Sequence, residues 1–171
     1  MSPDAMAQIQ EKSLDRHLQW ITAADNKAMS VLAFNAAVLG AIGFMMPSFE
    51  GRTSLDTVVL LLAALFPAMA IFQCSQVVFP RLTGPENSLI YFGGVATFEQ
   101  GAYIDAIKSL TDQNYIHDLM KQCHRNAEIA AMKYQALRKA FLWMYLGIPI
   151  CVACTYYFTY FTPSAGRPHG S

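Results

Sequence analysis

The stretch between Gly84 and Phe98 carries the clearest potential for ligand chemistry. It reads GPENSLIYFGGVATF, and in it a short apolar and aromatic run, 89–92, directly precedes Gly93 and Gly94. Two adjacent glycines let a backbone turn tightly or approach a phosphate closely. Aromatic side chains beside such a turn can stack on a nucleobase. These residues alone leave two interpretations open, a nucleotide site or an amphipathic loop that packs against neighbouring helices, and the second is the simpler.

Residues typical of enzymes and metal sites are few. His117 and Asp118 form the dipeptide of metal-dependent phosphohydrolases, but such sites need further His and Asp ligands, and the chain has four histidines in all. His117 and His124 are seven residues apart, so on a helix they are two turns apart, which makes a chelating pair unlikely to form. Cys151 and Cys154 form a C-x-x-C pattern in an apolar segment, where cysteine packs as a small apolar residue. We expect no metal, no cofactor and no catalytic residue, and hence no enzymatic activity.

Three windows of the sequence contain no charged residue. The whole chain is 54% hydrophobic and 14% charged, whereas soluble domains average about 25% charged residues. Each window exceeds the roughly 20 residues that a helix needs to cross the hydrocarbon layer of a bilayer. A soluble domain of 171 residues would struggle to wrap three such helices. We therefore predict an all-α membrane protein with three transmembrane helices in the windows Ala28–Phe49, Thr57–Pro80 and Ala140–Gly166.

The distribution of lysine and arginine predicts the orientation. Ten of these residues precede the first window or lie between the second and third, and two lie elsewhere. Cytoplasmic loops carry the excess of lysine and arginine, so the N-terminus and the large loop are expected in the cytoplasm. The net charge is zero, and nothing in this balance points to nucleic acid.

These patterns define the expected organisation. A cytoplasmic stalk helix over 1–27 precedes the first span, 28–46, and a short loop leads to the second span, 57–79. A cytoplasmic loop with further stalk helices, 80–139, precedes the third span, 140–162. The remaining outer tail, 163–171, is expected to include a vector-derived remnant.

Two apolar seams predict that spans one and three extend into the cytoplasm as helices. Both spans run in the same direction, so their extensions are parallel neighbours that can pack as a stalk. The seams alternate spacings of four and three residues. The first comprises Leu14, Leu18, Ile21, Asp25 and Ala28, and the second comprises Cys123, Ala127, Ala130, Tyr134, Leu137, Phe141, Met144 and Ile148.

Local signals predict where the helices begin and end. Pro47 is expected to end the first long helix. Thr97 and Gln100 have the spacing of a capping box at the start of a short helix. A turn is expected over 112–114, followed by a long helix over 115–161.

Polar residues within the predicted spans have two competing roles. Asn35, Gln73 and Gln76 are the strongest polar groups there. They can hydrogen-bond between helices of a bundle or oligomer, or they can line a wettable pore. The first role is the simpler one. Pro67 and Pro149 each remove a backbone hydrogen bond within a span and permit a kink.

A purely structural role is hardest to assign to Asp25, because this charged residue lies on the first apolar seam, about one turn before span one. A carboxylate at a helix interface is costly unless it is paired. Lys27 points to another side of the helix and is a poor partner. Counted from the starts of their spans, Arg138 and Lys139 lie at about the depth of Asp25. We predict that these four residues couple the stalk to the spans; the alternative is that Asp25 faces solvent at the membrane boundary.

Several short motifs stand out together by their order and spacing: Trp20-Ile21, Ala24 to Ala28, Ser88 to Gly93, Lys133-Tyr134 and Leu137-Arg138. In this order they resemble the membrane-spanning effectors of the Pycsar anti-phage systems. The resemblance runs from about residue 14 to 162, and Gly94 departs from the pattern at a position expected to vary. It implies an effector encoded beside a pyrimidine cyclase, activated by cyclic UMP or cyclic CMP, that damages the bacterial inner membrane and causes abortive infection.

The resemblance gives the glycine-containing loop a role in binding the nucleotide. Tyr91 or Phe92 would stack on the base, Gly93 would admit the phosphate, and Asn87 would read the pyrimidine edge. A phosphate partner is expected in Arg81 or Arg125. The effector is expected to assemble as a homo-oligomer in the lipid bilayer. The alternatives are a membrane-anchored interaction subunit and a constitutive holin-like pore, neither of which binds a nucleotide.

Overall fold

The protein is described by a computed structural model that covers residues 2–45, 53–81, 83–85 and 87–160. In these ranges it forms five helices and no strand. By its internal contacts the chain divides into two units. The first unit comprises Met1–Asn26 and Phe79–Gln135, and the second comprises Lys27–Val78 and Ala136–Ser171. The expected outer tail, 163–171, and the helix end expected at Pro47 both lie outside the described residues.

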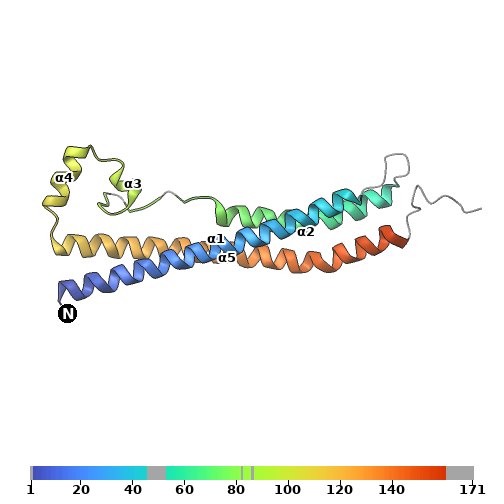
Figure 1. Ribbon diagram of the computed structural model, residues 1–171, viewed down its shortest axis with the longest axis horizontal. Helices are drawn as coiled ribbons and strands as arrows, with labels where there is room; N and C mark the ends of the chain where they lie inside the picture. Colours follow the sequence, from blue (N-terminus) through green and yellow to red (C-terminus); the bar gives the residue numbers. More distant parts are fainter. Residues whose placement is uncertain (1, 46–52, 82, 86, 161–171) are drawn as a thin grey trace, which may run out of the picture. The chain divides into compact units, whose positions relative to one another are not determined.

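Three of the helices are long, α1 (Pro3–Phe44), α2 (Ser54–Val78) and α5 (Asp112–Tyr160) (Figure 1). Each is long and apolar enough to cross a membrane. This confirms the predicted all-α class with three membrane-spanning helices. Both α1 and α5 continue without a break from one unit into the other. Which residues lie in the bilayer stays a prediction.

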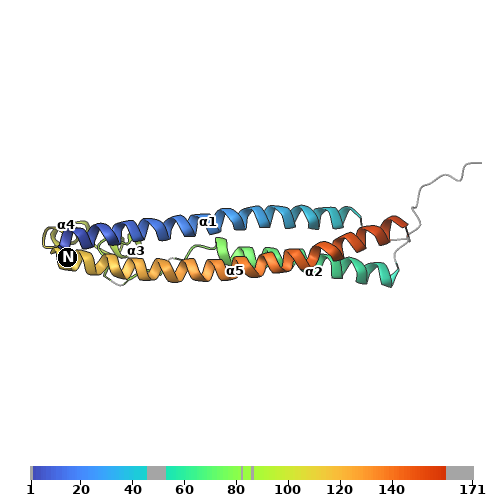
Figure 2. The same ribbon diagram turned by 90° about the horizontal axis from the view of Figure 1, so that it is seen from below.

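In the first unit, the early part of α1 lies beside the early part of α5, as Figures 1 and 2 both show. The seam of α1 differs from the predicted one. Ala24 and Ala28 are fully buried, Ile21 is half-buried, and Leu18 is 46% exposed. Alanines let two helices approach closely, so the small residues define the contact face. A hydrophobic pattern that gives most weight to leucine does not identify this contact face.

The seam of α5 is close to the predicted one but differs at Tyr134 and Ile148, which are both exposed. Most of its buried residues follow one another at steps of three, four or seven, which is the spacing of one helix face. Lys133 occupies the place that the sequence pattern gave to Tyr134, because the lysine has a carboxylate partner, described below. The buried positions include Ile116, Leu119, Cys123, Ala130, Lys133, Leu137 and Ala140.

Two short helices precede α5, namely α3 (Phe92–Val95) and α4 (Gln100–Lys108). The short helix at Gln100 is confirmed, but its capping box is wrong. Thr97 Oγ1 donates a hydrogen bond to the carbonyl oxygen of Gly94, at 2.7 Å, and α4 has no side-chain cap. The predicted turn over 112–114 is also wrong, because Thr111 Oγ1 accepts the N–H of Asn114 and starts α5 there.

The second unit has a small apolar core and a large exposed apolar surface. The core contains Ile42, Leu60, Ala63 and Cys154. Large side chains such as Leu61 (66% exposed) and Val152 (64% exposed) cover the outside of the helices. Such a surface is unfavourable in water and suits the hydrocarbon of a bilayer.

A capping box that the sequence analysis did not single out starts α2. Thr53 N–H and Thr53 Oγ1–H both donate to Asp56 Oδ2, at 2.9 and 2.8 Å, and Asp56 N–H donates to Thr53 Oγ1. The hydroxyl of Tyr157 donates to Asp56 Oδ1 at 3.0 Å. The start of α2 is thereby joined to the end of α5.

Candidate ligand-binding site

Ser88 fixes the loop before α3 to the surface of α5. Its side chain is fully buried, and its hydroxyl donates to Asp118 Oδ2 at 3.0 Å. Gln122 Nε2 donates to the same hydroxyl oxygen at 2.9 Å. The hydroxyl oxygen also accepts the N–H groups of Ile90 and Tyr91, at 3.2 and 2.9 Å. One buried side chain therefore holds both the turn of the loop and its contact with α5.

Asp118 makes a second contact with the loop. Its Oδ2 accepts the N–H of Leu89 at 2.9 Å, in addition to the hydroxyl of Ser88. The aspartate of the His117-Asp118 dipeptide therefore has a structural role, which is to attach the loop to α5. Sequence reasoning missed this role, because the two partners are about thirty residues apart in the chain.

A pocket of about 320 Å³ opens beside this attachment. The loop, α4 and α5 all contribute to it, and pockets for small ligands start at about this size. The lining mixes apolar walls with carboxamide, hydroxyl, imidazole, carboxylate and ammonium groups. Its residues are Asn87, Leu89, Ala106, Ser109, Leu110, Asn114, His117, Asp118 and Lys121.

Asn87 suits its place in the pocket lining both by its backbone conformation and by its side-chain chemistry. Its φ is 56°, in the left-handed region that asparagine and glycine tolerate best. Its carboxamide offers both a donor and an acceptor. Of the six residues predicted to bind the ligand, Asn87 is the one that lines this pocket.

The aromatic and glycine run is packed onto itself. A Cβ on Gly93 would meet the ring of Tyr91 at 2.5 Å, and a Cβ on Gly84 would collide with the same ring. Phe92 is 65% exposed and contacts the Tyr91 ring, with 4.7 Å between centroids. A Cβ on Gly94 would lie 2.6 Å from the carbonyl oxygen of Ser88. Gly93 thus makes room for Tyr91, and Gly94 permits the close approach of two backbone segments.

The two arginines predicted to bind phosphate hold the linker that follows α2. The guanidinium of Arg125 donates to the carbonyl oxygen of Thr83 at 3.0 Å and to the Thr83 hydroxyl. Arg125 also pairs with Glu128 at 2.8 Å, and this hydrogen bond lowers the pKa of the Glu128 carboxyl. Arg81 donates to the sulfur of Met132. Neither arginine lines the pocket.

Comparison with known proteins assigns the family. A family model described as the Pycsar effector protein domain matches residues 9–160, which is most of the chain. The chain belongs to the Pycsar effector protein family. Membership supports an anti-phage effector role and confirms the resemblance seen in the sequence motifs.

The effector is also similar to a curated relative, the Pycsar effector protein SaPycTM of Staphylococcus aureus. The two are 21% identical over 148 residues, which cover 86% of this chain and 90% of the relative. No solved structure matches.

In the first unit of the effector, Asp25 has a partner other than the one expected. Its carboxylate pairs with Lys133, at 2.5 Å between Nζ and Oδ1. The expected partners, Arg138 and Lys139, are exposed residues further along α5. Aligning the spans by their first uncharged residues had placed Asp25 level with Leu137, and the observed partner is one helical turn earlier. The prediction of Arg138 or Lys139 is therefore wrong, because charge-free windows do not mark equal depths on the two helices.

The polar residues of the second unit differ in their surroundings. Asn35 is 2% exposed, and its Nδ2 donates to the carbonyl oxygen of Val31 in its own helix at 2.7 Å. Gln73 is half-buried and Gln76 is exposed. The roles of these residues in an oligomer or a pore stay predictions, as does the coupling role of Lys27.

Proposed function

We propose that the chain is a membrane effector activated by a cyclic pyrimidine nucleotide, cyclic UMP or cyclic CMP. Activation impairs the bacterial inner membrane and leads to abortive infection. The N-terminus and the first unit lie in the cytoplasm, as the excess of lysine and arginine there favours. The observation that carries the proposal is the polar pocket beside the Ser88 attachment, in a chain of the Pycsar effector family.

The pocket lining suits a small anionic nucleotide. Lys121 supplies an ammonium group for the phosphate. Asp118 repels a phosphate placed next to it, so the phosphate lies at the Lys121 end. Asn87 and Asn114 carry carboxamides that can pair with the donor and acceptor edge of a pyrimidine. Leu89 and the other apolar residues provide a wall for the base or ribose.

This assignment revises the role of the aromatic run. Tyr91 fills the space over Gly84 and Gly93, and it supports the loop from within. His117 supplies the ring that lines the pocket. Arg125 holds the linker instead of a phosphate.

A bound nucleotide would touch the loop, α4 and α5 together. Its effect therefore passes into α5, the helix that continues into the second unit. Asp25 and Lys133 join α1 to α5 and keep the coupling role proposed for Asp25.

Several copies assemble in the bilayer, where the exposed apolar surface of α2 is available for contact.

Isothermal titration calorimetry on the purified effector tests the ligand. We expect binding of cyclic UMP or cyclic CMP and much weaker binding of cyclic AMP. Lys121→Gln should weaken binding about tenfold or more, because a charged hydrogen bond to phosphate contributes about 1.5–3 kcal/mol. Asn87→Gly keeps the left-handed backbone and removes the carboxamide, so it should weaken binding without unfolding the loop. Lys108→Gln, an exposed change outside the pocket, is the matched control.

Dye release from liposomes separates the proposal from its alternatives. The proposal expects release that depends on the cyclic pyrimidine. Release without nucleotide indicates a constitutive pore, and the absence of both binding and release indicates an interaction subunit.

Thiol labelling tests the proposed orientation. In protein without its own cysteines, a single thiol at position 54 should react with an impermeant reagent from outside, and one at position 109 only after lysis.

A further inference from the structure

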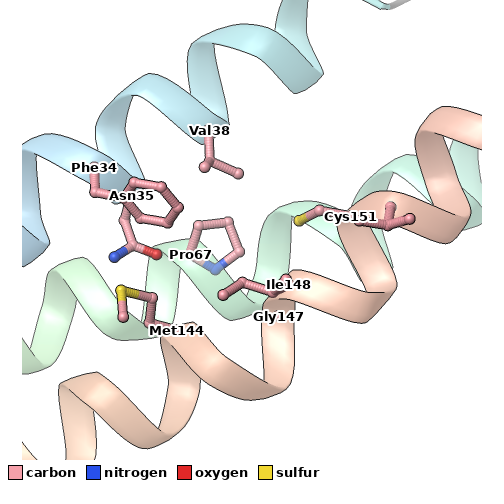
Figure 3. A pocket seen from close by; sticks show the side chains of 9 residues that line it. Phe34, Asn35, Val38, Pro67, Met144, Gly147, Ile148 and Cys151 are labelled. Atoms are coloured by element: carbon pink, nitrogen blue, oxygen red, sulfur yellow. The ribbon is translucent and has the colours of Figure 1, made fainter.

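A second pocket, of about 200 Å³, lies within the second unit between α1, α2 and α5 (Figure 3). It is distinct from the nucleotide pocket and shares no residue with it. Its walls are almost entirely aliphatic, aromatic or sulfur-containing. The lining residues are Phe34, Asn35, Val38, Pro67, Met144, Gly147, Ile148, Cys151 and Val152.

The pocket lies where α2 lacks a backbone hydrogen bond. Pro67 has no N–H, so the carbonyl oxygen of Ala63, four residues earlier, loses its partner within the helix. The thiol of Cys151 on α5 points to that oxygen, with 3.8 Å between sulfur and oxygen. A Cβ on Gly147 would lie 2.8 Å from Cβ of Phe66, so α5 approaches α2 closely on this side. These two contacts hold α2 and α5 together beside the pocket, so the pocket is a defined part of the packing of this unit.

Asn35 places a single acceptor on this apolar pocket. Its side chain is almost completely buried and projects from α1 between the other two helices (Figure 3). Its Nδ2 is satisfied by the carbonyl oxygen of Val31. Its Oδ1 accepts no hydrogen bond from any residue in the described part of the chain. This oxygen is not fully enclosed by protein atoms and is therefore open to the pocket. A carbonyl oxygen that meets only hydrocarbon lacks a donor at a cost, so it favours an occupant that brings one.

Water is a poor occupant. A buried water molecule makes about three hydrogen bonds, and this lining offers one unpaired acceptor. Apolar cavities stay dry, and one of about 150 Å³ holds a benzene molecule. The present pocket is somewhat larger and differs by its one acceptor.

We infer that this pocket binds an uncharged amphiphile with one hydroxyl group, such as an alkanol, whose hydroxyl donates to Asn35 Oδ1. The apolar body of the ligand lies against Val38, Pro67 and Ile148. Phe34, Ile148 and Val152 are 48%, 43% and 64% exposed, so the pocket opens on the surface that hydrocarbon would cover. The ligand therefore enters from the bilayer. This inference is independent of the proposed nucleotide site.

Photolabelling in nanodiscs of defined phosphatidylcholine tests the inference. The probe is an octanol that carries a diazirine group, and adducts are located by mass spectrometry. We expect adducts on the lining residues of α1 and α5. Unlabelled 1-octanol should displace the probe at an about fivefold lower concentration in the bilayer than octane, which corresponds to one hydrogen bond of typical strength. Asn35→Leu, which keeps an apolar helix face, should abolish this difference.

A second variant fills the pocket without touching the acceptor. Val38→Phe should reduce the adducts at least tenfold, whereas Leu142→Phe, on the exposed surface outside the pocket, should leave them unchanged. A further arm adds dioctanoylglycerol, a lipid with one hydroxyl. Competition by this lipid identifies the bilayer itself as the source of the hydroxyl, and competition by octanol alone identifies a small solute. Equal competition by octane and octanol, or adducts that persist in Val38→Phe, would overturn the inference.

Discussion

Lys133 is 4% exposed and forms an ion pair with Asp25, whose side chain is 37% exposed. The two charges therefore differ in how much they depend on each other. Removing the carboxylate leaves a buried ammonium group without this counter-charge, whereas removing the ammonium leaves a carboxylate that water can reach.

The pair should respond unequally to substitution. Asp25→Asn is expected to destabilise the first unit by about 3 kcal/mol, the lower end of the range for breaking a buried pair. Lys133→Met keeps the apolar stem and should cost about 1 kcal/mol or less. Unfolding followed by circular dichroism measures both. A double variant more stable than Asp25→Asn alone supports this explanation, and equal losses from the two single changes contradict it.

The attachment of the loop through Ser88 predicts a local pattern of hydrogen exchange. Ser88→Ala removes the acceptor of the Ile90 and Tyr91 N–H groups, so these amides should exchange faster. Asp118→Asn should instead speed exchange at Leu89, whose N–H donates to that carboxylate. Ser88→Ala should also destabilise the unit by about 1–3 kcal/mol, because Asp118 and Gln122 lose a buried partner. Unchanged exchange at all three amides would show that the loop is held by other contacts.

The adjacent glycines should not tolerate alanine equally. In Gly94→Ala the new Cβ meets a backbone carbonyl oxygen that cannot move aside, so the loop must shift. In Gly93→Ala it meets the ring of Tyr91, which can rotate. We expect a larger loss of thermal stability for Gly94→Ala. In a Tyr91→Ala background, Gly93→Ala should have little further effect, and a persistent loss there would count against the proposed packing.

Tyr115 and Glu11 predict a change at alkaline pH. The Tyr115 hydroxyl donates to Glu11 at 2.6 Å, and this hydrogen bond raises the pKa of Tyr115 above its usual value of 10.0. The contribution to stability is complete below the pKa of the unfolded chain and is lost as pH rises through the folded pKa. Absorbance titration of the protein minus its Tyr115→Phe variant isolates this group among eight tyrosines. Glu11→Gln should move the pKa of Tyr115 down; no movement would refute the hydrogen bond.

Much of the fold could be predicted from local patterns. Charge-free windows predicted the three long apolar helices, whereas the local start and stop signals did less well, because the capping box at Thr97 and the turn over 112–114 were both wrong. The capping box of Thr53 and Asp56 was present in the sequence and could have been used to start α2. The turn expected over 112–114 was wrong because Thr111 caps α5, which therefore begins at Asp112, three residues earlier than expected.

The candidate site could be predicted only in part. The loop was singled out for its glycines and aromatic residues. Asn87 lines a pocket there, and its predicted role in binding a ligand stays a prediction. The partners of Ser88 were not, because Asp118 and Gln122 reach it through the packing of the loop on α5. The register of α1 against α5 was also missed, since small residues such as Ala24 decide it. A hydropathy pattern records that a residue is apolar but not how closely it lets two helices approach.

The alanines that line the contact between α1 and α5 have a mechanical consequence. Alanine has no side-chain rotamers to rearrange, and its surface offers only shallow ridges to a neighbouring helix. Ala24 of α1 and Ala130 of α5 are both buried close in sequence to the ion pair of Asp25 and Lys133. Helices that present such small residues can slide along each other by shear with few side chains to repack. Because the alanine surface itself favours no particular position along the helices, the ion pair of Asp25 and Lys133 is a contact that favours one register of α1 against α5.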